Sequence, residues 1–256
     1  MDDSSTITPK YTFSLADLKL LTRRHGDAET GGHRSRGPTA WLWIALVVLL
    51  ASPSHASEWR SVLDTSDGIQ IFKKDATESG LIEFRGVGVV EAPLPVVATV
   101  IFDTERRVQW IKGLKESRIV RWEGHDSFIE YDHIDMPTFF SDRDFVSKVR
   151  MRSDQAKREV VFQFHPADDP SAPPTDYLRG EVINMTFALR SVDHDTRTRV
   201  DAEFLCDPKG WIPAWLVNFF LKDWPKTTFR NLRKEVLKSG IAVDPRFSEL
   251  HEPANQ

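Results

Sequence analysis

The chain after residue 57 alternates between apolar and polar positions over most of its length, and this period of two predicts β-strands. Short strands that follow one another through tight polar or proline-rich connections indicate an antiparallel meander. The alternation is interrupted where apolar residues recur at spacings of three and four, which predicts helices. Strands are predicted at residues 69–73, 81–91, 116–122, 127–136, 144–152, 159–165, 178–190 and 196–206.

Three short helices are predicted in the first part of this region. One covers Glu58–Leu63, and two follow the second strand at Pro95–Asp103 and Glu105–Gly113. Gly86 and Gly88 within the second strand indicate a bend or a close approach of another element. The residues of the two later helices that are predicted to face inward are Val97, Val100, Ile101, Val108 and Ile111.

A longer amphipathic helix is predicted at the end of the domain. Pro213 opens it, Pro225 should bend it, and Gly240 is placed to end it. Its apolar stripe consists of Leu216, Phe219, Phe220, Phe229, Leu232 and Val236. Its other face carries Lys222, Lys226, Arg230, Lys234 and Lys238, which form either a solvated helix face or a surface that touches an anionic membrane transiently.

These elements predict an α+β architecture with a single domain over residues 57–240. The sheet must curve around the last helix, because only that helix can cover so many apolar inward positions. The polar residues 241–256 are expected to form a disordered tail.

Residues 1–56 are predicted to be an N-terminal extension and signal peptide. The uncharged run Ala40–Ala51 is shorter than the roughly 20 residues of a membrane-spanning helix. Small residues before Ser57 predict cleavage after Ala56 and export, most simply to a bacterial periplasm. The charged leader before the run is long, which suggests a translation start downstream of Met1. The alternative is an uncleaved membrane anchor at residues 40–51.

Composition adds little to this picture except by exclusion. With 28% charged residues and a net charge of -4, the chain lacks the dense basic stripe of a nucleic-acid-binding protein. Cys206 is the sole cysteine, so no intramolecular disulfide can form, and its apolar neighbours favour a packing role. A monomer is expected.

Two segments resemble the START family, the steroidogenic-acute-regulatory-related lipid transfer domains. They are Ser141–Val146, which reads SDRDFV, and Asp207–Asn218, which reads DPKGWIPAWLVN. The resemblance extends over nearly all of residues 58–240 and implies a helix-grip fold, in which a curved sheet and the last helix enclose an elongated apolar cavity. It also implies a gate between that helix and the loop Pro137–Phe140. Together with the predicted signal peptide, the resemblance suggests an exported bacterial member of the family. The two adjacent phenylalanines of that loop could instead cap the core.

A hydrophobic small molecule or lipid, of sterol-like, hopanoid or acyl type, is therefore the expected partner. Its site should combine an apolar lining with a few polar groups. For each candidate alone, ordinary core packing is the alternative. The predicted ligand-binding residues are Trp110, Phe128, Glu130, Ile134, Met136, Phe139, Phe140, Phe145, Val149, Arg150, Phe162, Phe164, Met185, Phe187, Phe204, Trp215 and Phe219.

The resemblance makes an inward ion pair between Arg150 and either Glu130 or Asp132 reasonable. An acid and an arginine in an apolar interior stay charged only as a pair, because each alone carries a large desolvation penalty. Strand alternation leaves the facing direction open, so a solvated cross-strand pair is the alternative.

An enzyme is the rival class, and it is not the expected one. No Gly-x-Ser-x-Gly elbow is present, and the histidines lack metal-ligand spacing, so neither metal nor cofactor is expected. His133 with Asp135 is the nearest approach to a catalytic pair. Because helix-grip relatives include cyclases and aromatases, an enzyme acting on a hydrophobic substrate in the same cavity is the alternative function.

Overall fold

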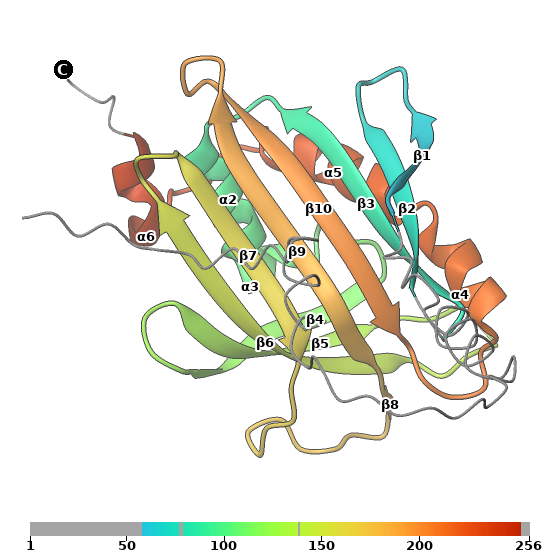
Figure 1. The fold of residues 1–256 in the computed structure, drawn as a ribbon. Helices are drawn as coiled ribbons and strands as arrows, with labels where there is room; N and C mark the ends of the chain where they lie inside the picture. The colour runs from blue at the N-terminus through green and yellow to red at the C-terminus, as the bar shows by residue number, and fades with distance from the viewer. Residues whose placement is uncertain (1–57, 77–78, 138, 252–256) are drawn as a thin grey trace, which may run out of the picture. The chain divides into compact units, whose positions relative to one another are not determined.

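The strands form one ten-stranded sheet in the order β1-β2-β3-β10-β9-β7-β6-β5-β4, and β8 pairs with β6 outside this path (Figure 1). Neighbours along the path are antiparallel, whereas β8 runs parallel to β6. The computed structural model describes residues 58–76, 79–137 and 139–251. The strands are β1 (Arg60–Asp64), β2 (Gln70–Ala76), β3 (Leu81–Val90), β4 (Leu114–Trp122), β5 (Ser127–Ile134), β6 (Arg143–Asp154), β7 (Glu159–Pro166), β8 (Leu178–Arg179), β9 (Glu181–Val192) and β10 (Arg197–Asp207).

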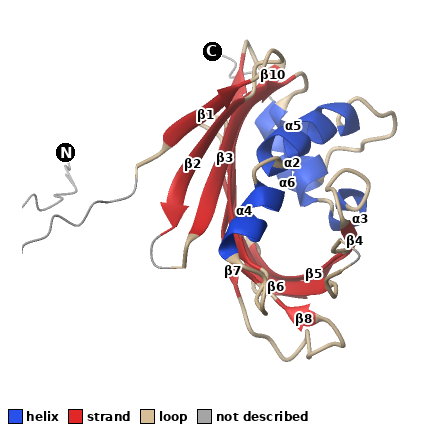
Figure 2. Ribbon diagram, turned by 90° about the vertical axis from the view of Figure 1, so that its right-hand side faces the viewer, coloured by secondary structure: helices blue, strands red, loops and turns tan. Residues whose placement is uncertain are grey.

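The sheet curves, and the helices lie on its concave side (Figure 2). This arrangement confirms the predicted α+β class and helix-grip architecture. The core lies between the sheet and these helices, because the large buried cluster draws residues from both. The helices are α2 (Leu94–Phe102), α3 (Thr104–Arg107), α4 (Ala214–Leu221), α5 (Trp224–Glu235), α6 (Pro245–Ser248) and the 3-10 helix η2 (Glu249–His251).

Helix α5 packs directly on β3 because two glycines leave room for it. A Cβ atom at Gly86 would lie 2.8 Å from the Phe229 ring and 2.9 Å from Cβ of Pro225, and one at Gly88 would lie 3.0 Å from the same ring. Side chains at these positions would hold the helix away from the sheet. The close approach predicted from the glycines is therefore present.

Gly86→Ala is expected to lower the free energy of unfolding by about 1–3 kcal/mol, because the new methyl overpacks the contact with Phe229. Chemical denaturation measures the loss. Phe229→Leu in the same chain should recover part of it, since it withdraws the ring atoms that the methyl meets. A Gly86→Ala chain within about 0.5 kcal/mol of wild type would contradict the contact.

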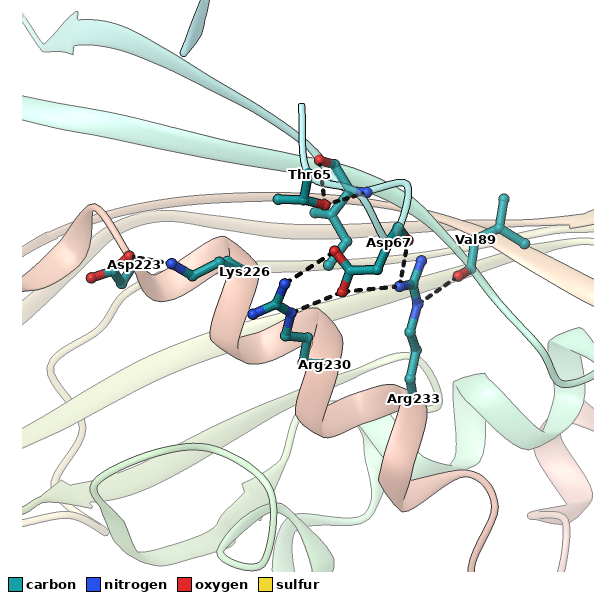
Figure 3. A network of polar contacts seen from close by, with 8 residues as sticks. Thr65, Asp67, Val89, Asp223, Lys226, Arg230 and Arg233 are labelled. Carbon is teal, nitrogen blue, oxygen red and sulfur yellow. Dashed lines mark hydrogen bonds and ion pairs between the residues drawn. The ribbon is translucent and has the colours of Figure 1, made fainter. Parts of the chain in front are cut away.

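An ion pair and a hydrogen bond to the main chain fix α5 to the β1–β2 turn and to β3 (Figure 3). Arg230 Nε donates to Asp67 Oδ2 over 2.8 Å, and Arg233 Nε donates to the main-chain oxygen of Val89 over 2.9 Å. The hydrogen bond from Arg230 is the main reason that the pKa of Asp67 lies below its usual range. The β1–β2 turn, which contains Asp67, thus helps to fix the position of α5 on β3.

Three local predictions are wrong or incomplete. Residues 60–64 form an edge strand instead of a helix, because their side chains are all exposed and offer no apolar face for a helix to bury. Helix α3 ends at Arg107 instead of extending to residue 113. The predicted strand 178–190 is divided at Gly180, where a Cβ atom would lie 2.4 Å from the Phe145 ring. The predicted bend at Pro225 is present, since the last helix divides into α4 and α5 just before it.

The prediction of a disordered tail is wrong for residues 241–251. This segment forms α6 and η2, and Phe247 and Leu250 are 1% and 5% exposed within the core. The Phe247 ring contacts Phe102 of α2 and Phe162 of β7 at 5.9 and 6.0 Å between centroids. Ile241 packs against the same core, so three apolar side chains of this segment dock it.

The predicted signal segment, with the apolar run at residues 40–51, lies outside the described residues, as do residues 252–256. Within the described ranges, none of the helices has both the length and the apolar character needed to cross a bilayer.

Candidate ligand-binding site

Alternate residues of five neighbouring strands meet in rows across the concave face of the sheet. In one row Phe204 of β10 lies opposite Met185 of β9, which lies opposite Phe164 of β7. The row continues through Val149 of β6 to Phe128 of β5. The structure therefore brings five of the predicted ligand-binding residues side by side.

The apolar lining divides into a packed part and an accessible part. Phe128, Val149, Phe162, Phe164 and Phe187 are each 2% exposed or less and belong to the core. The partly buried residues that pack against this core include Ile111, Ile134, Met185, Phe204, Leu221 and Trp224.

The accessible part adjoins the junction of α4 and α5. The ring of Trp224 stacks on Phe204 at 4.6 Å between centroids and lies 6.3 Å from Phe187. Leu221 ends α4 three residues before this tryptophan. Apolar surface that remains open on the concave side is therefore next to the last turn of α4.

A buried ion pair lies on the same concave face. Arg107, the last residue of α3, binds both carboxylate oxygens of Glu130, with Nη1 donating to Oε1 over 2.8 Å and Nη2 donating to Oε2. The two side chains are 4% and 0% exposed. This bidentate geometry lets both charges persist in an apolar surrounding.

Polar side chains surround this ion pair on three strands. Asp132 follows on the same face of β5, opposite Ser117 of β4, and Ser147 of β6 lies opposite Glu130. Burial, followed by the nearby Glu130 carboxylate, raises the pKa of Asp132 well above its usual range. We call Arg107, Ser117, Glu130, Asp132 and Ser147 the polar cluster.

The predicted pairing of Glu130 or Asp132 with Arg150 is wrong. Arg150 is exposed and lies opposite Ser127, on the face of β5 and β6 that points away from Glu130. Alternation places residues 128, 130 and 132 on the concave face and residues 127, 129 and 131 on the convex one. Arg107 of α3 takes the place predicted for Arg150.

Large apolar side chains are exposed on α4 and on the two loops beside it. Phe139, Trp211 and Trp215 are 90%, 80% and 69% exposed. The rings of Phe140 and Trp211 lie 5.7 Å apart and so connect the β5–β6 loop to the loop before α4. We call this set the aromatic rim, and it consists of Phe139, Phe140, Trp211, Trp215, Phe219 and Phe220.

Arg143 joins the two loops that carry the rim. Its Nε donates to the main-chain oxygen of Pro208 over 2.9 Å, and its Nη1 donates to that of Ser141. On the same loop, Asp142 accepts hydrogen bonds from the main-chain nitrogen of Met136 at 3.1 Å and from His133 Nε2 at 2.8 Å. These bonds lower the pKa of Asp142, the Met136 bond most. The two sequence segments that carry the family resemblance are thus in direct contact.

A START domain model matches residues 45–238, which is more than half of the chain. The chain belongs to the START domain family. An uncharacterised protein of Pseudomonas aeruginosa is 26% identical over 196 residues, which cover 76% of this chain and 94% of that protein. The mouse phosphatidylcholine transfer protein is 28% identical over 183 residues, or 66% of this chain and 83% of that protein.

Solved structures agree with this assignment at the level of the fold. Human StAR-related lipid transfer protein 5 superimposes with a TM-score of 0.64 at 20% identity, covering 76% of this chain and 93% of that chain. The curved antiparallel sheet with its C-terminal helix is therefore the START, or helix-grip, fold.

The remaining predicted residues of this START domain occupy different places. Ile134 and Met136 lie at the rim end of β5. Phe145 is buried against Gly180, and Trp110 is buried just after α3. Trp215 and Phe219 point outward into the aromatic rim and do not line the concave face, since both are more than half exposed.

Arg107, Ser117 and Ser147 are site residues that the strand pattern did not reveal. Arg107 precedes Trp110 by three residues, and residues at this spacing share one face of a helix. Its position on the face of the predicted Trp110 was therefore the available signal that Arg107 points inward. The serines are small polar interruptions at inward strand positions. His133 bonds to Asp142 and stacks on Tyr177 at 4.1 Å, so its predicted association with Asp135 is wrong.

An open depression of about 520 Å³ lies at the β4–β5 turn, at the far end of these strands from the rim. Its lining includes Trp122, His125 and Arg246 and none of the predicted ligand-binding residues.

Proposed function

We propose that this START domain is a lipid-binding and lipid-transfer protein. It holds one lipid between the concave face of the sheet and α4–α5, with the polar end at the polar cluster. The observation that carries the proposal is the apolar row from Phe204 to Phe128 beside buried polar groups, the combination that a lipid site requires. The names of its relatives, phosphatidylcholine transfer protein and StAR-related lipid transfer protein, support it. A sterol-like, hopanoid or acyl lipid is the proposed cargo.

Helix α4 is the element that opens for the lipid. It buries only Val217, whereas α5 buries Pro225, Thr228, Phe229, Leu232 and Glu235. Elements with few buried contacts open at the lowest free energy. Movement about the α4–α5 junction would expose the accessible apolar surface near Phe204 and Trp224.

The aromatic rim is the surface that contacts the membrane during exchange. Exposed tryptophan and phenylalanine side chains on adjacent loops favour the interface between water and lipid. Lys222 lies 4.0 Å over the Phe219 ring and adds a cation at the same edge. The domain would dock by the rim with the opening under α4 facing the bilayer.

We expect Phe139→Ser, Trp211→Ser and Trp215→Ser together to slow lipid transfer between vesicles at least about tenfold. All three side chains are largely exposed, so the affinity for lipid in solution and the free energy of unfolding should change little. The measurement is the rate at which a pyrene-labelled lipid moves from donor to acceptor vesicles. Leu237→Ser, at a 73% exposed position beyond α5, is the matched control. Transfer by the triple variant at the control rate would contradict docking by the rim.

A carrier function is favoured over catalysis. The described residues contain no group of three or more His, Cys, Asp or Glu side chains that could hold a metal ion. Burial raises the pKa of the Cys206 thiol to about 12, which makes it a poor nucleophile at neutral pH. Native mass spectrometry of the purified chain separates the two classes, because a carrier retains an intact lipid. Turnover of a bound substrate that is lost in His133→Ala would favour the enzyme.

We also propose that the protein is cleaved after Ala56 and exported to the periplasm as a monomer. The apolar run at residues 40–51 and the small residues after it support export. N-terminal sequencing of the secreted protein distinguishes this from a membrane anchor, since an anchored chain would keep the run.

A further inference from the structure

The sheet divides at the start of β3. Strand β3 pairs with β10 only from Phe84 onward, where Phe84 lies opposite Phe204, whereas β10 continues along β9 as far as Asp207. Leu81 and Ile82 therefore pair with β2 on one side and have no strand beside them on the other. The main-chain groups on that side need another partner.

The side chain of Asn218, in α4, supplies this partner. Its Oδ1 accepts a hydrogen bond from the main-chain nitrogen of Ile82 over 2.9 Å, and its Nδ2 donates to the main-chain oxygen of Gly80 over 2.9 Å. An asparagine amide carries a donor and an acceptor as a peptide group does, so it takes the place of one peptide unit of a strand. In the described part of the chain, no other side chain of α4 makes a hydrogen bond to another element.

The apolar contacts of α4 form a small cluster of their own. Val217 packs with Leu81 and Leu205, and this group is separate from the large core cluster. Leu221, at the end of α4, contacts both clusters. Helix α4 can therefore leave the sheet about this end while α5 and the large core stay in place.

The two main-chain groups that Asn218 binds are accessible to water once α4 moves. Gly80 is exposed and Ile82 is only partly buried even with α4 in place. Water then replaces the lost hydrogen bonds, so opening leaves no buried polar group unpaired. The contact favours the closed position of α4 only modestly, as a step that must reverse in every transfer cycle requires.

We infer that Asn218 is a positioning residue for lipid exchange. It holds α4 closed against β3, and release of its two hydrogen bonds sets the rate at which lipid enters and leaves. The inference rests on the proposed lipid-transfer function and names the contact that governs its kinetics. It also explains the last residue of the segment Asp207–Asn218, which the mechanism of transfer otherwise leaves without a role.

The first test separates exchange rate from affinity. Asn218→Leu, which keeps the size of the side chain and removes both hydrogen bonds, should speed uptake and release about tenfold each. The dissociation constant should stay within about twofold, because the contact is lost equally with and without lipid. The probes are pyrene-labelled phosphatidylcholine and a pyrene-labelled sterol, measured with the full chain and vesicles.

Two further variants accompany this one. Asn218→Asp keeps the acceptor for Ile82 and loses the donor to Gly80, so its rates should lie about threefold above wild type. Asn184→Leu is the matched control, because it removes a hydrogen bond from β9 to Glu83 without touching α4. Wild-type rates in Asn218→Leu, or a weaker affinity without faster exchange, would overturn the inference. A wild-type chain that carries neither probe would instead count against the proposed function.

The second test needs no lipid and therefore stands apart from the proposed function. In the lipid-free wild-type chain, the amide hydrogen of Ile82 should exchange with solvent at least about tenfold faster than that of Phe84, which lies in the ladder with β10. Movement of α4 alone exposes the first, whereas the second requires the sheet to open. Asn218→Leu should speed exchange at Ile82 and leave Phe84 unchanged. Equal protection of the two amides in wild type would show that α4 does not open separately and would end the inference.

Discussion

Replacement of Glu130 with leucine should lower the free energy of unfolding by about 3–5 kcal/mol. The side chain is fully buried, and its carboxylate holds both terminal nitrogens of Arg107, which is itself 4% exposed. Without this acid, the buried guanidinium loses both hydrogen bonds of its bidentate partner, and only the neighbouring Asp132 and the more distant Asp103 carry an opposing charge. Arg107→Met should destabilise the chain by a similar amount for the converse reason. Chemical denaturation monitored by tryptophan fluorescence measures both.

The double variant Arg107→Met with Glu130→Leu tests the cause of this loss. Once both charges are removed, the apolar replacements should restore the free energy of unfolding to within about 1–2 kcal/mol of wild type. Arg150→Met is the matched control, because this exposed arginine of β6 should change stability by less than about 0.5 kcal/mol. Additive losses in the double variant would show that the two residues act separately and would contradict the ion pair.

The interior apolar positions could be predicted from the sequence because alternation of period two is local. Phe128, Val149, Phe164, Met185 and Phe204 were each assigned to an inward face within their own strand. Register then aligned them in one row. A row of this kind requires only that each strand keep its apolar residues on the concave side.

The partner of Glu130 could not be predicted in this way. Arg107 precedes it by 23 residues and comes from a four-residue helix, so the contact depends on how α3 packs against the sheet. The strand register turns Arg150 away from Glu130, but strand alternation in the sequence left that direction open and could not select among arginines on other elements. Tertiary packing decides such pairs, and periodicity carries no information about it.

The family motifs are explained by a contact that the sequence could not display. Arg143 of the first segment donates to Pro208 of the second, so the β5–β6 loop and the approach to α4 are held together. Because Phe139 and Trp211 stand on these two loops, the same bond sets the geometry of the aromatic rim. A motif of this type marks the side of the domain where α4 meets the sheet.

Phe247→Ala should lower the free energy of unfolding by about 3–5 kcal/mol, although the residue lies in a segment whose composition predicts disorder. The ring is 1% exposed and contacts Phe102 and Phe162, so its removal leaves a cavity between α2 and β7. Loss of α6 and η2 by ending the chain at residue 243 should destabilise it at least as much, since Leu250 leaves with it.

Val243→Ala is the control for both changes, because this residue of the same segment is 38% exposed. It should shift the denaturation midpoint little. If Phe247→Ala also left the midpoint unchanged, the segment would not belong to the folded core. The expected loss of stability would show that the cooperatively folding unit extends to residue 251. The family match ends earlier, at residue 238. The end of the concave face near α2 is then closed by the chain itself, which leaves the side beneath α4 as the route for the lipid.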